Sequence, residues 1–228
     1  MKQGGNLIIP SFAVERTQDL LFDLTILISQ DRLDPGISIY IDSPLAIAAT
    51  EIFKKNITFY DQETKQLIRE GHHPLKLPNL KYSSSRADSM KLNEVKTGAI
   101  IISASGMCDA GRIQYHLRNN LGRSESTILF VGYQAEGTLG RQIIDGAKSV
   151  ELFGKQIEVK ASIEKELSYS AHADQRELLN WIGNFKSKPK KVFVVHGEEA
   201  AQQTIAKLIQ AELNIPVKIP DWLEAVEL

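Results

Sequence analysis

Residues 99–112 read AIIISASGMCDAGR, and this stretch decides the class of fold. The run Ala99–Ser103 is apolar on both alternating faces, which is typical of a strand buried on both sides of a parallel sheet. Small residues and two glycines follow it and predict a turn. Residues Arg112–Leu121 then carry apolar side chains at helical spacing, which predicts a helix directly after that turn.

The same strand-then-helix unit recurs on both sides of this stretch. Short apolar or β-branched runs predict strands at Leu7–Pro10, Ile37–Ile41, Thr127–Val131 and Lys191–Val195. Helical apolar stripes predict helices at Arg16–Gln30, Pro44–Lys55 and Glu198–Leu213. The alternation indicates an α/β fold with a mostly parallel sheet flanked by helices.

One segment breaks this rhythm. Val150–Phe153 and Gln156–Lys160 flank Gly154 and predict a β-hairpin. The strand and helix units are shorter after it, so we expect a change of module near residues 160–168.

Composition excludes several classes of protein. The chain has 228 residues, of which 43% are hydrophobic and 24% charged, enough to bury a core. Its net charge of −1 gives no basic field for bulk attraction of nucleic acid. Apolar runs are far shorter than the roughly 20 residues that span a bilayer, so no membrane segment is expected. The single cysteine, Cys108, and the lack of a signal-like start at Met1–Gly5 fit a reducing cytoplasm.

The turn at residues 103–112 is the first candidate site. Its glycines would let the backbone approach a ligand closely, and the next helix would point its positive end at the loop. Arg112 would add a bidentate donor suited to phosphate or carboxylate. A tight turn with a surface arginine fits the residues equally well, so both interpretations stay open.

Two histidines lie where chemistry is expected. His172 precedes a helix that Asp174 and Glu177 would start as a capping box, and it suits a proton donor or a metal ligand. His196 follows the predicted strand Lys191–Val195, with Gly197 leaving room in front of it. An exposed turn residue and a satisfied buried histidine are the respective alternatives.

Other motifs are weaker. The pair His72–His73 fits a solvated loop, because adjacent residues of an extended chain point opposite ways. His116 lies on an apolar helix face and fits a packed core histidine. Gly132–Arg141 has spaced glycines but lacks the order of a dinucleotide-binding loop.

Taken together, six segments resemble the β-CASP branch of the metallo-β-lactamase nucleases, which process RNA as endonucleases or exonucleases. They occur in the family's order along the chain. The segments are Ile9–Gln18, Asp42–Ala46, Ser105–Arg112, Gly132–Thr138, Ser170–Asp174 and Val195–Glu198.

The resemblance implies roles for particular residues. His172 matches a histidine that faces the scissile phosphate and serves as a general acid, and His196 matches a zinc ligand. The implied substrate-binding residues are Ser105, Gly106, Met107, Arg112, Ser170 and Ala171. Two zinc ions would hold the attacking hydroxide in the intact enzyme.

The chain departs from the family in one respect. The HxHxDH motif and the further ligands of an N-terminal lactamase region do not occur in it. A catalytic zinc needs about three protein ligands, and this chain offers one by resemblance. We therefore expect residues 1–165 to be a β-CASP domain and residues 166–228 the last part of a metallo-β-lactamase αββα fold. Met1 is then not expected to be the start of the intact enzyme.

The leading hypothesis is a fragment of a zinc-dependent RNA-processing nuclease, inactive by itself. The alternative is a catalytically inactive scaffold subunit of an RNA-processing complex, against which the presence of both His172 and His196 argues. An unrelated small-molecule enzyme is a third class. The implied partners are RNA and the missing lactamase region. Binding of DNA, formation of a homodimer and the choice between endonuclease and exonuclease cleavage stay open. We also expect exposed apolar surface on residues 166–228.

Overall fold

The computed structural model describes residues 4–166, 168–170 and 172–226. These residues divide into two compact units, Met1–Ser170 and Ala171–Leu228, which we call unit 1 and unit 2. No helix in these three ranges is long and apolar enough to cross a membrane.

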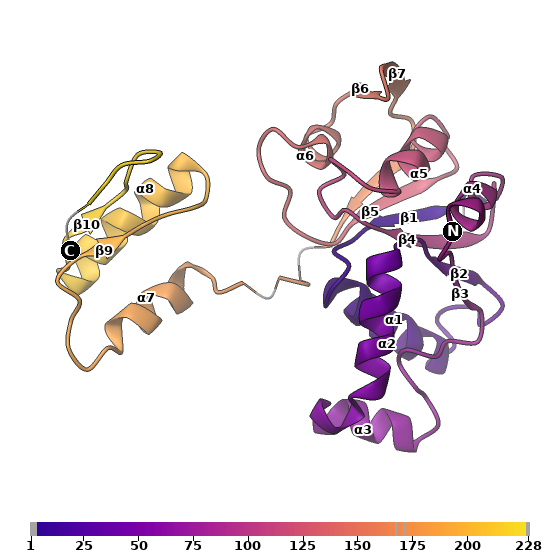
Figure 1. Cartoon of the computed structure of the whole chain (residues 1–228), viewed down its shortest axis with the longest axis horizontal. Helices are drawn as coiled ribbons and strands as arrows, with labels where there is room; N and C mark the ends of the chain where they lie inside the picture. Colours follow the sequence, from indigo (N-terminus) through magenta and orange to yellow (C-terminus); the bar gives the residue numbers. More distant parts are fainter. Residues whose placement is uncertain (1–3, 167, 171, 227–228) are drawn as a thin grey trace. The chain divides into compact units, whose positions relative to one another are not determined.

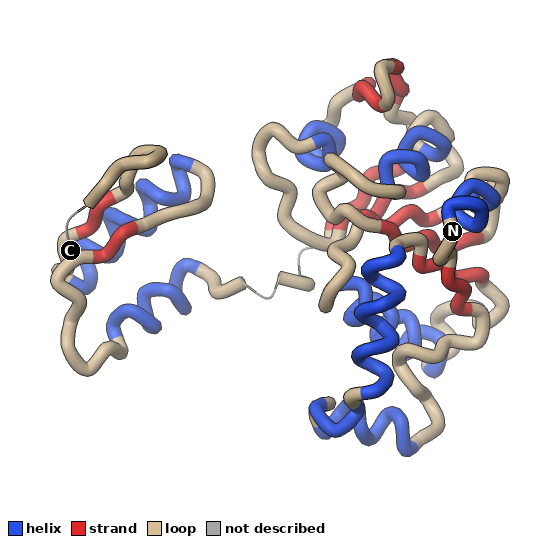
Figure 2. The backbone as a smooth tube through the Cα atoms, viewed as in Figure 1, coloured by secondary structure: helices blue, strands red, loops and turns tan. Residues whose placement is uncertain are grey.

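Unit 1 is built on a six-stranded sheet with the order β3-β2-β4-β1-β5-β8 (Figure 2). Every neighbouring pair in this sheet is parallel. The strands are β1 (Leu7–Pro10), β2 (Ser38–Ile41), β3 (Leu80–Tyr82), β4 (Ala99–Ser103), β5 (Thr127–Phe130) and β8 (Ser162–Lys165). The expected α/β class with a mostly parallel sheet flanked by helices is therefore confirmed.

Helices cover both faces of this sheet (Figure 1). On one face, α5 (Ile113–Asn120) and α6 (Leu139–Ile144) pack their apolar side chains on Ile8, Ile101 and Ile128. On the other face, α1 (Arg16–Ser29) and α2 (Pro44–Lys55) pack on Ile9, Ile100 and Ile102. Burial of β4 from both sides explains why all five of its residues are apolar or small.

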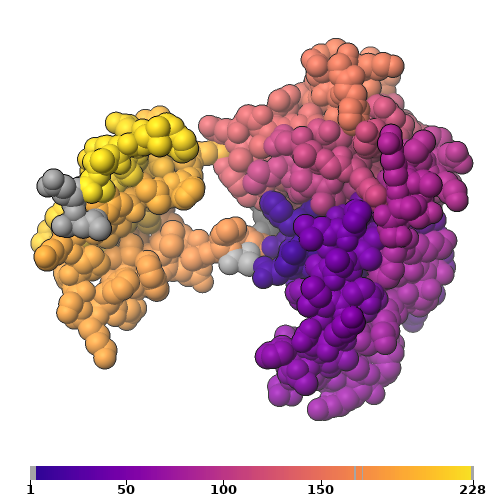
Figure 3. Space-filling model, viewed as in Figure 1, coloured from indigo at the N-terminus to yellow at the C-terminus, as the bar shows by residue number. Residues whose placement is uncertain are grey.

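The predicted hairpin is also present. β6 (Ser149–Leu152) pairs antiparallel with β7 (Lys155–Glu158), and Phe153 and Gly154 form the turn with positive φ angles. The hairpin protrudes from unit 1 (Figure 3). Val150 and Leu152 anchor it in the core beneath α5 and α6.

Several short elements were not predicted from the sequence. They are the 3₁₀ turn η1 (Ile57–Phe59), α3 (Gln62–Arg69), β3, α4 (Arg86–Leu92), α6, β8 and β10. The strands β3 and β8 lie at the two edges of the sheet, where only one side needs a partner. Their sequences, LKY and SIEK, therefore lack the continuous apolar pattern of β4.

Unit 2 is small. It consists of α7 (Gln175–Gly183), β9 (Val192–Phe193), α8 (Glu199–Leu208), the π-helical turn η2 (Ile209–Leu213) and β10 (Val217–Lys218). β9 and β10 form a two-stranded parallel sheet, and Leu179, Ile182, Ile209 and Ile215 form the core. The strand expected over Lys191–Val195 is thus shorter and only half-buried, because β10 is its one partner among the described residues.

Exposed apolar side chains on residues 166–228 were expected and are found. On α7 and just beyond it, Leu178, Trp181 and Phe185 are exposed by 39%, 65% and 45%. Trp181 and Phe185 contact each other edge to face, with 5.1 Å between ring centroids.

Candidate functional site

The loops that carry the sequence motifs of unit 1 leave the sheet at one edge. Because all six strands are parallel, their carboxyl ends meet there. The ladder continues into these loops, since the backbone N–H groups of Ser11, Asp42 and Glu166 donate to carbonyls of the neighbouring strands. The loops that follow β1, β2, β4 and β5, which carry residues of four motif segments, are thereby brought to one edge, as is Glu166 after β8.

The loop at residues 104–112 folds back on itself. Ser105 N donates to Ala110 O at 3.1 Å, and Ile113 N donates to Ala104 O at 3.2 Å. Gly111 has φ +86°, and a Cβ there would lie 2.4 Å from Ala104 O. The glycine therefore makes room for the loop's own backbone, not for a ligand as the sequence suggested.

A second loop clamps the first from the β5 side. Gln134 Nε2 donates to Gly106 O at 3.0 Å, and Gly140 N donates to Met107 O at 3.1 Å. Asp109 Oδ1 accepts from Leu139 N at 2.8 Å. A Cβ at Gly140 would lie 1.8 Å from Gln134 Oε1, so a side chain there would displace the Gln134 amide. Of the spaced glycines in residues 132–141, Gly140 thus serves loop packing.

A buried ionic network holds the first loop from the β2 side. The carboxylate of Asp42 is fully buried at the end of β2. It accepts from Arg112 Nη1 at 2.8 Å and from Ser89 Oγ at 2.6 Å, and its Oδ2 lies 2.6 Å from His116 Nε2. Burial acts to raise the pKa of Asp42, but the hydrogen bonds from His116, Ser89 and Arg112 outweigh it and place the pKa below its usual value. Asp42 therefore stays ionised and fixes the loop.

This network changes the interpretation of Arg112 and His116. Arg112 also donates to Ser83 O at 2.7 Å and to Ser84 O at 3.3 Å, so it is neither a surface arginine nor an unengaged phosphate donor. Its role toward substrate stays a prediction. His116 is a packed core histidine, as expected, at 1% exposure. That its partner is Asp42 was not predicted from the sequence.

Exposed aromatic rings lie on the loops at this edge. Phe12 is 49% exposed, and its ring contacts the Gly106 position of the 104–112 loop. Tyr133, in the loop that follows β5, is 58% exposed. Thr17 and Ser11 brace the Phe12 backbone, since both hydroxyls bond to Phe12 O.

The two candidate histidines lie in unit 2, each three residues before a helix. His172 is exposed, and the predicted capping box after it is present: Glu177 N donates to Asp174 Oδ1 at 2.8 Å. His196 is exposed with φ +66°, and its carbonyl accepts from Gln202 Nε2. Ala171 lies outside the described residues, and Ser170 is exposed. The closeness of the two imidazoles stays a prediction.

The described residues do not form a metal site by themselves. Among residues 4–166, 168–170 and 172–226, no three His, Cys, Asp or Glu side chains gather closely enough to hold an ion. Cys108 is buried, and burial raises the pKa of its thiol above the usual range, so it is no thiolate ligand. His73 is half-buried and accepts from Leu75 N, and it forms no pair with the exposed His72.

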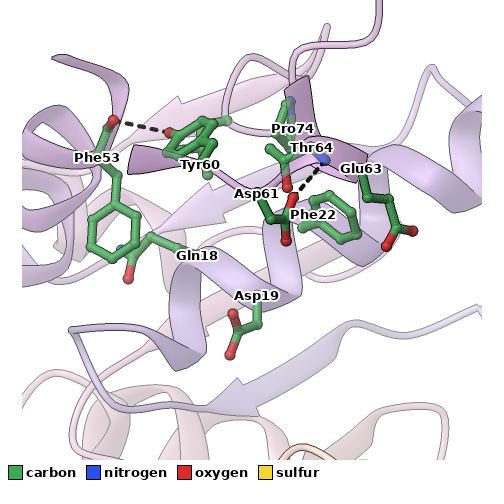
Figure 4. Close-up of a pocket in the computed structure, with 10 residues that line it drawn as sticks. Gln18, Asp19, Phe22, Phe53, Tyr60, Asp61, Glu63, Thr64 and Pro74 are labelled. Carbon is green, nitrogen blue, oxygen red and sulfur yellow. Dashed lines mark hydrogen bonds between the residues drawn. The ribbon is translucent and has the colours of Figure 1, made fainter. Parts of the chain in front are cut away.

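A cavity lies elsewhere in unit 1 (Figure 4). It measures about 330 Å³ between α1, η1 and α3. Its lining residues are Gln18, Asp19, Phe22, Phe53, Tyr60, Asp61, Glu63, Thr64, Pro74 and Leu75, of which only Gln18 belongs to a sequence motif. The loops at the carboxyl edge do not line it.

Two family models match the chain. The Beta-Casp domain matches residues 17–143, and a domain described as a Zn-dependent metallo-hydrolase RNA specificity domain matches residues 156–220. The first covers α1 through most of α6. The second includes both His172 and His196.

The chain is also similar to several longer proteins. Ribonuclease TTHA0252 of Thermus thermophilus is 32% identical over 209 residues, covering 92% of this chain and 47% of that protein. An RNase J-like protein of Methanocaldococcus jannaschii is 32% identical over 96% of this chain and 49% of its own length. Transcription termination factor FttA of Pyrococcus abyssi is 30% identical over the whole chain and 36% of its own length. The chain spans about half or less of these relatives.

Proposed function

This chain belongs to the Beta-Casp family, and on that premise we propose that it supplies the RNA-holding part of a zinc-dependent ribonuclease that hydrolyses phosphodiester bonds. The observation that carries this proposal is the convergence of the family's motif loops at one carboxyl edge of the parallel sheet. Ligands of open α/β sheets bind at that edge.

The 104–112 loop is proposed to contact the RNA backbone. The Asp42 network and Gln134 hold this loop from both sides, so it is ordered before substrate arrives. Ser105, Gly106, Met107 and Arg112 belong to it, and Ser170 and Ala171 are proposed to join them from the segment before α7. A prearranged loop loses little entropy on binding.

Exposed rings support a single-stranded substrate. Phe12 and Tyr133 both lie on loops at this edge, and aromatic side chains stack on unpaired bases of any sequence. The net charge of −1 gives the chain no general attraction for nucleic acid, so local contacts of this kind have to hold the RNA.

His172 is proposed as the general acid and His196 as a metal ligand. Both lie within the segment that matches the RNA specificity domain, and both are exposed and so accessible to a substrate or an ion. As an imidazolium, His172 would give its proton to the oxygen that leaves phosphorus.

Zinc does not fit the described residues alone, since they bring no three ligands together. We propose that His196 contributes one ligand and that a metallo-β-lactamase region outside this chain contributes the others. Removing the metal from the intact protein with a chelator should then abolish cleavage.

Variants of the full-length gene product test these roles. His172→Ala should lower single-turnover RNA cleavage by about 10²–10⁴-fold at unchanged zinc content, the usual loss for a general acid. His196→Ala should lower both cleavage and zinc content, because the ion loses a ligand. His72→Ala is the matched control and should change neither.

Two outcomes would contradict the assignment. Loss of zinc in His172→Ala with retention in His196→Ala would mean that the roles are reversed. Cleavage at the parent rate in both variants, with intact zinc, would refute both roles. If the unsubstituted full-length product binds RNA but does not cleave it under any metal condition, the alternative of an inactive scaffold subunit is favoured.

A further inference from the structure

The segment that leads from the sheet to His172 is tied to unit 1 by a tyrosine. The parallel ladder reaches Glu166, whose backbone N–H donates to Phe130 O at 2.8 Å. Ser168 N then donates to Glu166 Oε1 at 2.9 Å and turns the chain. Tyr169 follows, one residue before the end of unit 1 and three residues before His172.

Tyr169 is held on several sides. Its hydroxyl donates to the Asp23 carboxylate on α1, 146 residues away in sequence. The guanidinium of Arg16 lies 5.2 Å from the centre of its ring. The half-buried ring also packs on the core cluster that contains α1 residues such as Leu20 and Leu24. The contacts therefore combine a charge-assisted hydrogen bond, a cation–π contact and apolar burial.

The other end of this tie is firmly placed. Helix α1 buries Leu20, Leu21 and Leu24 against the sheet, and Arg16 pairs with Asp19 at 2.9 Å. Burial, followed by the hydrogen bond to Asp23 and its charge, raises the pKa of Tyr169. The phenol therefore remains a donor throughout the neutral range.

We propose that Tyr169 is a positioning residue for His172, and that its contacts with Asp23 and Arg16 restrict the region that His172 can reach. The expected effect on RNA cleavage rests on the proposed function. The expected restriction of the segment between Tyr169 and His172 does not. Three residues span at most about 10 Å, so the tie confines His172 to within that distance of the place on α1 where Asp23 and Arg16 hold Tyr169.

Loss of the tie would enlarge this region. Without the tie, the nearest fixed point is the ladder hydrogen bond of Glu166. His172 lies six positions after Glu166, and six residues span at most about 20 Å. Doubling the reach enlarges the accessible volume about eightfold, and the effective concentration of the acid at its target falls in proportion.

Spin labels on the two units measure the restriction directly. Lys155→Cys on the hairpin and Lys207→Cys on α8 provide exposed labelling sites, and the buried Cys108 is protected from label. In the 228-residue chain, Tyr169→Ala should broaden the distribution of label-to-label distances. Tyr60→Phe is the matched control: it removes a tyrosine hydroxyl that donates to Phe53 O at 2.9 Å in the same unit, and should leave the distribution unchanged.

Partner variants separate positioning from simple loss of stability. Asp23→Ala and Tyr169→Phe each remove the hydrogen bond and should both broaden the distribution, whereas Asp23→Asn keeps an oxygen acceptor and should retain the parent distribution. In the full-length gene product, Tyr169→Ala should lower kcat about eightfold with little change in KM.

If the label-to-label distances of Tyr169→Ala were distributed as narrowly as those of Tyr60→Phe, the proposal would be overturned, whatever the cleavage activity of the variant. A broad distribution with parent kcat in an active full-length protein would overturn the positioning of His172. If the unsubstituted full-length protein cleaves no RNA, the proposed function fails while the label distances still decide whether Tyr169 restricts the segment.

Discussion

At the scale of single residues, a fully buried carboxylate is costly unless donors satisfy it. Asp42 has three such partners: the Arg112 guanidinium, the Ser89 hydroxyl and the His116 imidazole. They come from the 104–112 loop, α4 and α5, so one carboxylate joins three separate segments to the end of β2. The candidate site depends on this residue although nothing indicates that Asp42 meets substrate.

We expect Asp42→Asn to destabilise unit 1 by about 3 kcal/mol at neutral pH, because it removes a fully buried carboxylate from its three donors and leaves the half-buried Arg112 guanidinium without its counter-charge. Asp109→Asn is the control and should change stability by less than about 0.5 kcal/mol, since the exposed amide oxygen can still accept from Leu139 N. Both tryptophans, Trp181 and Trp222, lie in unit 2. For Asp42→Asn, the urea concentration at the midpoint of unfolding should therefore fall when unfolding is followed by far-UV circular dichroism. The midpoint followed by tryptophan fluorescence should stay unchanged. Equal shifts for both variants would contradict the buried network.

The stabilisation by Asp42 should also depend on pH in a defined direction. Its folded-state pKa is lowered, so its contribution is fully present above the ordinary carboxyl pKa of about 3.9 and is lost as pH falls through the lower folded value. The difference in unfolding free energy between the parent and Asp42→Asn should be constant from pH 7 to 5 and shrink below about pH 4. Urea titrations across this range measure it, and a difference that grows on acidification would reverse the assigned sign.

At the scale of elements, the carboxyl-edge loops are stiffened by contacts with each other. Asp109, Gly106 and Met107 of the 104–112 loop all bond to residues of the loop and helix after β5. Gly111 closes the same loop at a φ that other residues rarely adopt. The loop is therefore a packed element, not a flexible flap.

Gly111→Ala should destabilise unit 1 by about 2 kcal/mol or more, because the new Cβ meets Ala104 O and φ is unfavourable. Gly122→Ala is the matched control, since its Cβ would meet nothing nearer than 3.9 Å and its φ is not positive. Far-UV circular dichroism during urea unfolding compares them. A Gly111→Ala variant as stable as Gly122→Ala would mean that the loop relaxes without cost.

At the scale of the whole molecule, the two units carry different parts of the proposed chemistry. Unit 1 holds the loops that are proposed to contact RNA, and unit 2 holds His172 and His196. Unit 2 also exposes Leu178, Trp181 and Phe185, an apolar surface of the kind that marks an interaction site. Neither unit brings three metal ligands together among its described residues.

We therefore expect the purified 228-residue chain neither to retain zinc after gel filtration nor to cleave RNA, because a single histidine cannot hold the ion against water. Metal analysis and an RNA cleavage assay with added zinc measure both properties. The full-length gene product, assayed in parallel, is the positive control. Robust metal-dependent cleavage by the chain alone would contradict this view of the site.

Local sequence patterns were enough to predict the α/β class, the main strands and helices, the hairpin and the capping box at Asp174. These features depend on neighbours within a few residues, through apolar periodicity, turn residues and caps, so the local pattern encodes them. The ordered motifs also located the family from the sequence alone. The short edge strands β3 and β8 were not predicted, because a strand with one partner needs no continuous apolar run.

Contacts between side chains far apart in the sequence could be identified only from the folded chain. Asp42 pairs with residues 70 and 74 positions away, Gln134 with a carbonyl 28 away, and Tyr169 with a carboxylate 146 away. Such pairs follow from the strand order β3-β2-β4-β1-β5-β8, which places β2 beside β4 and β4 beside β1. No local signal specifies that order, because it results from packing all the strands and helices at once. Arg112 consequently fitted either a phosphate donor or a surface arginine in the sequence, whereas in the fold its guanidinium bonds to Asp42 and to Ser83 O.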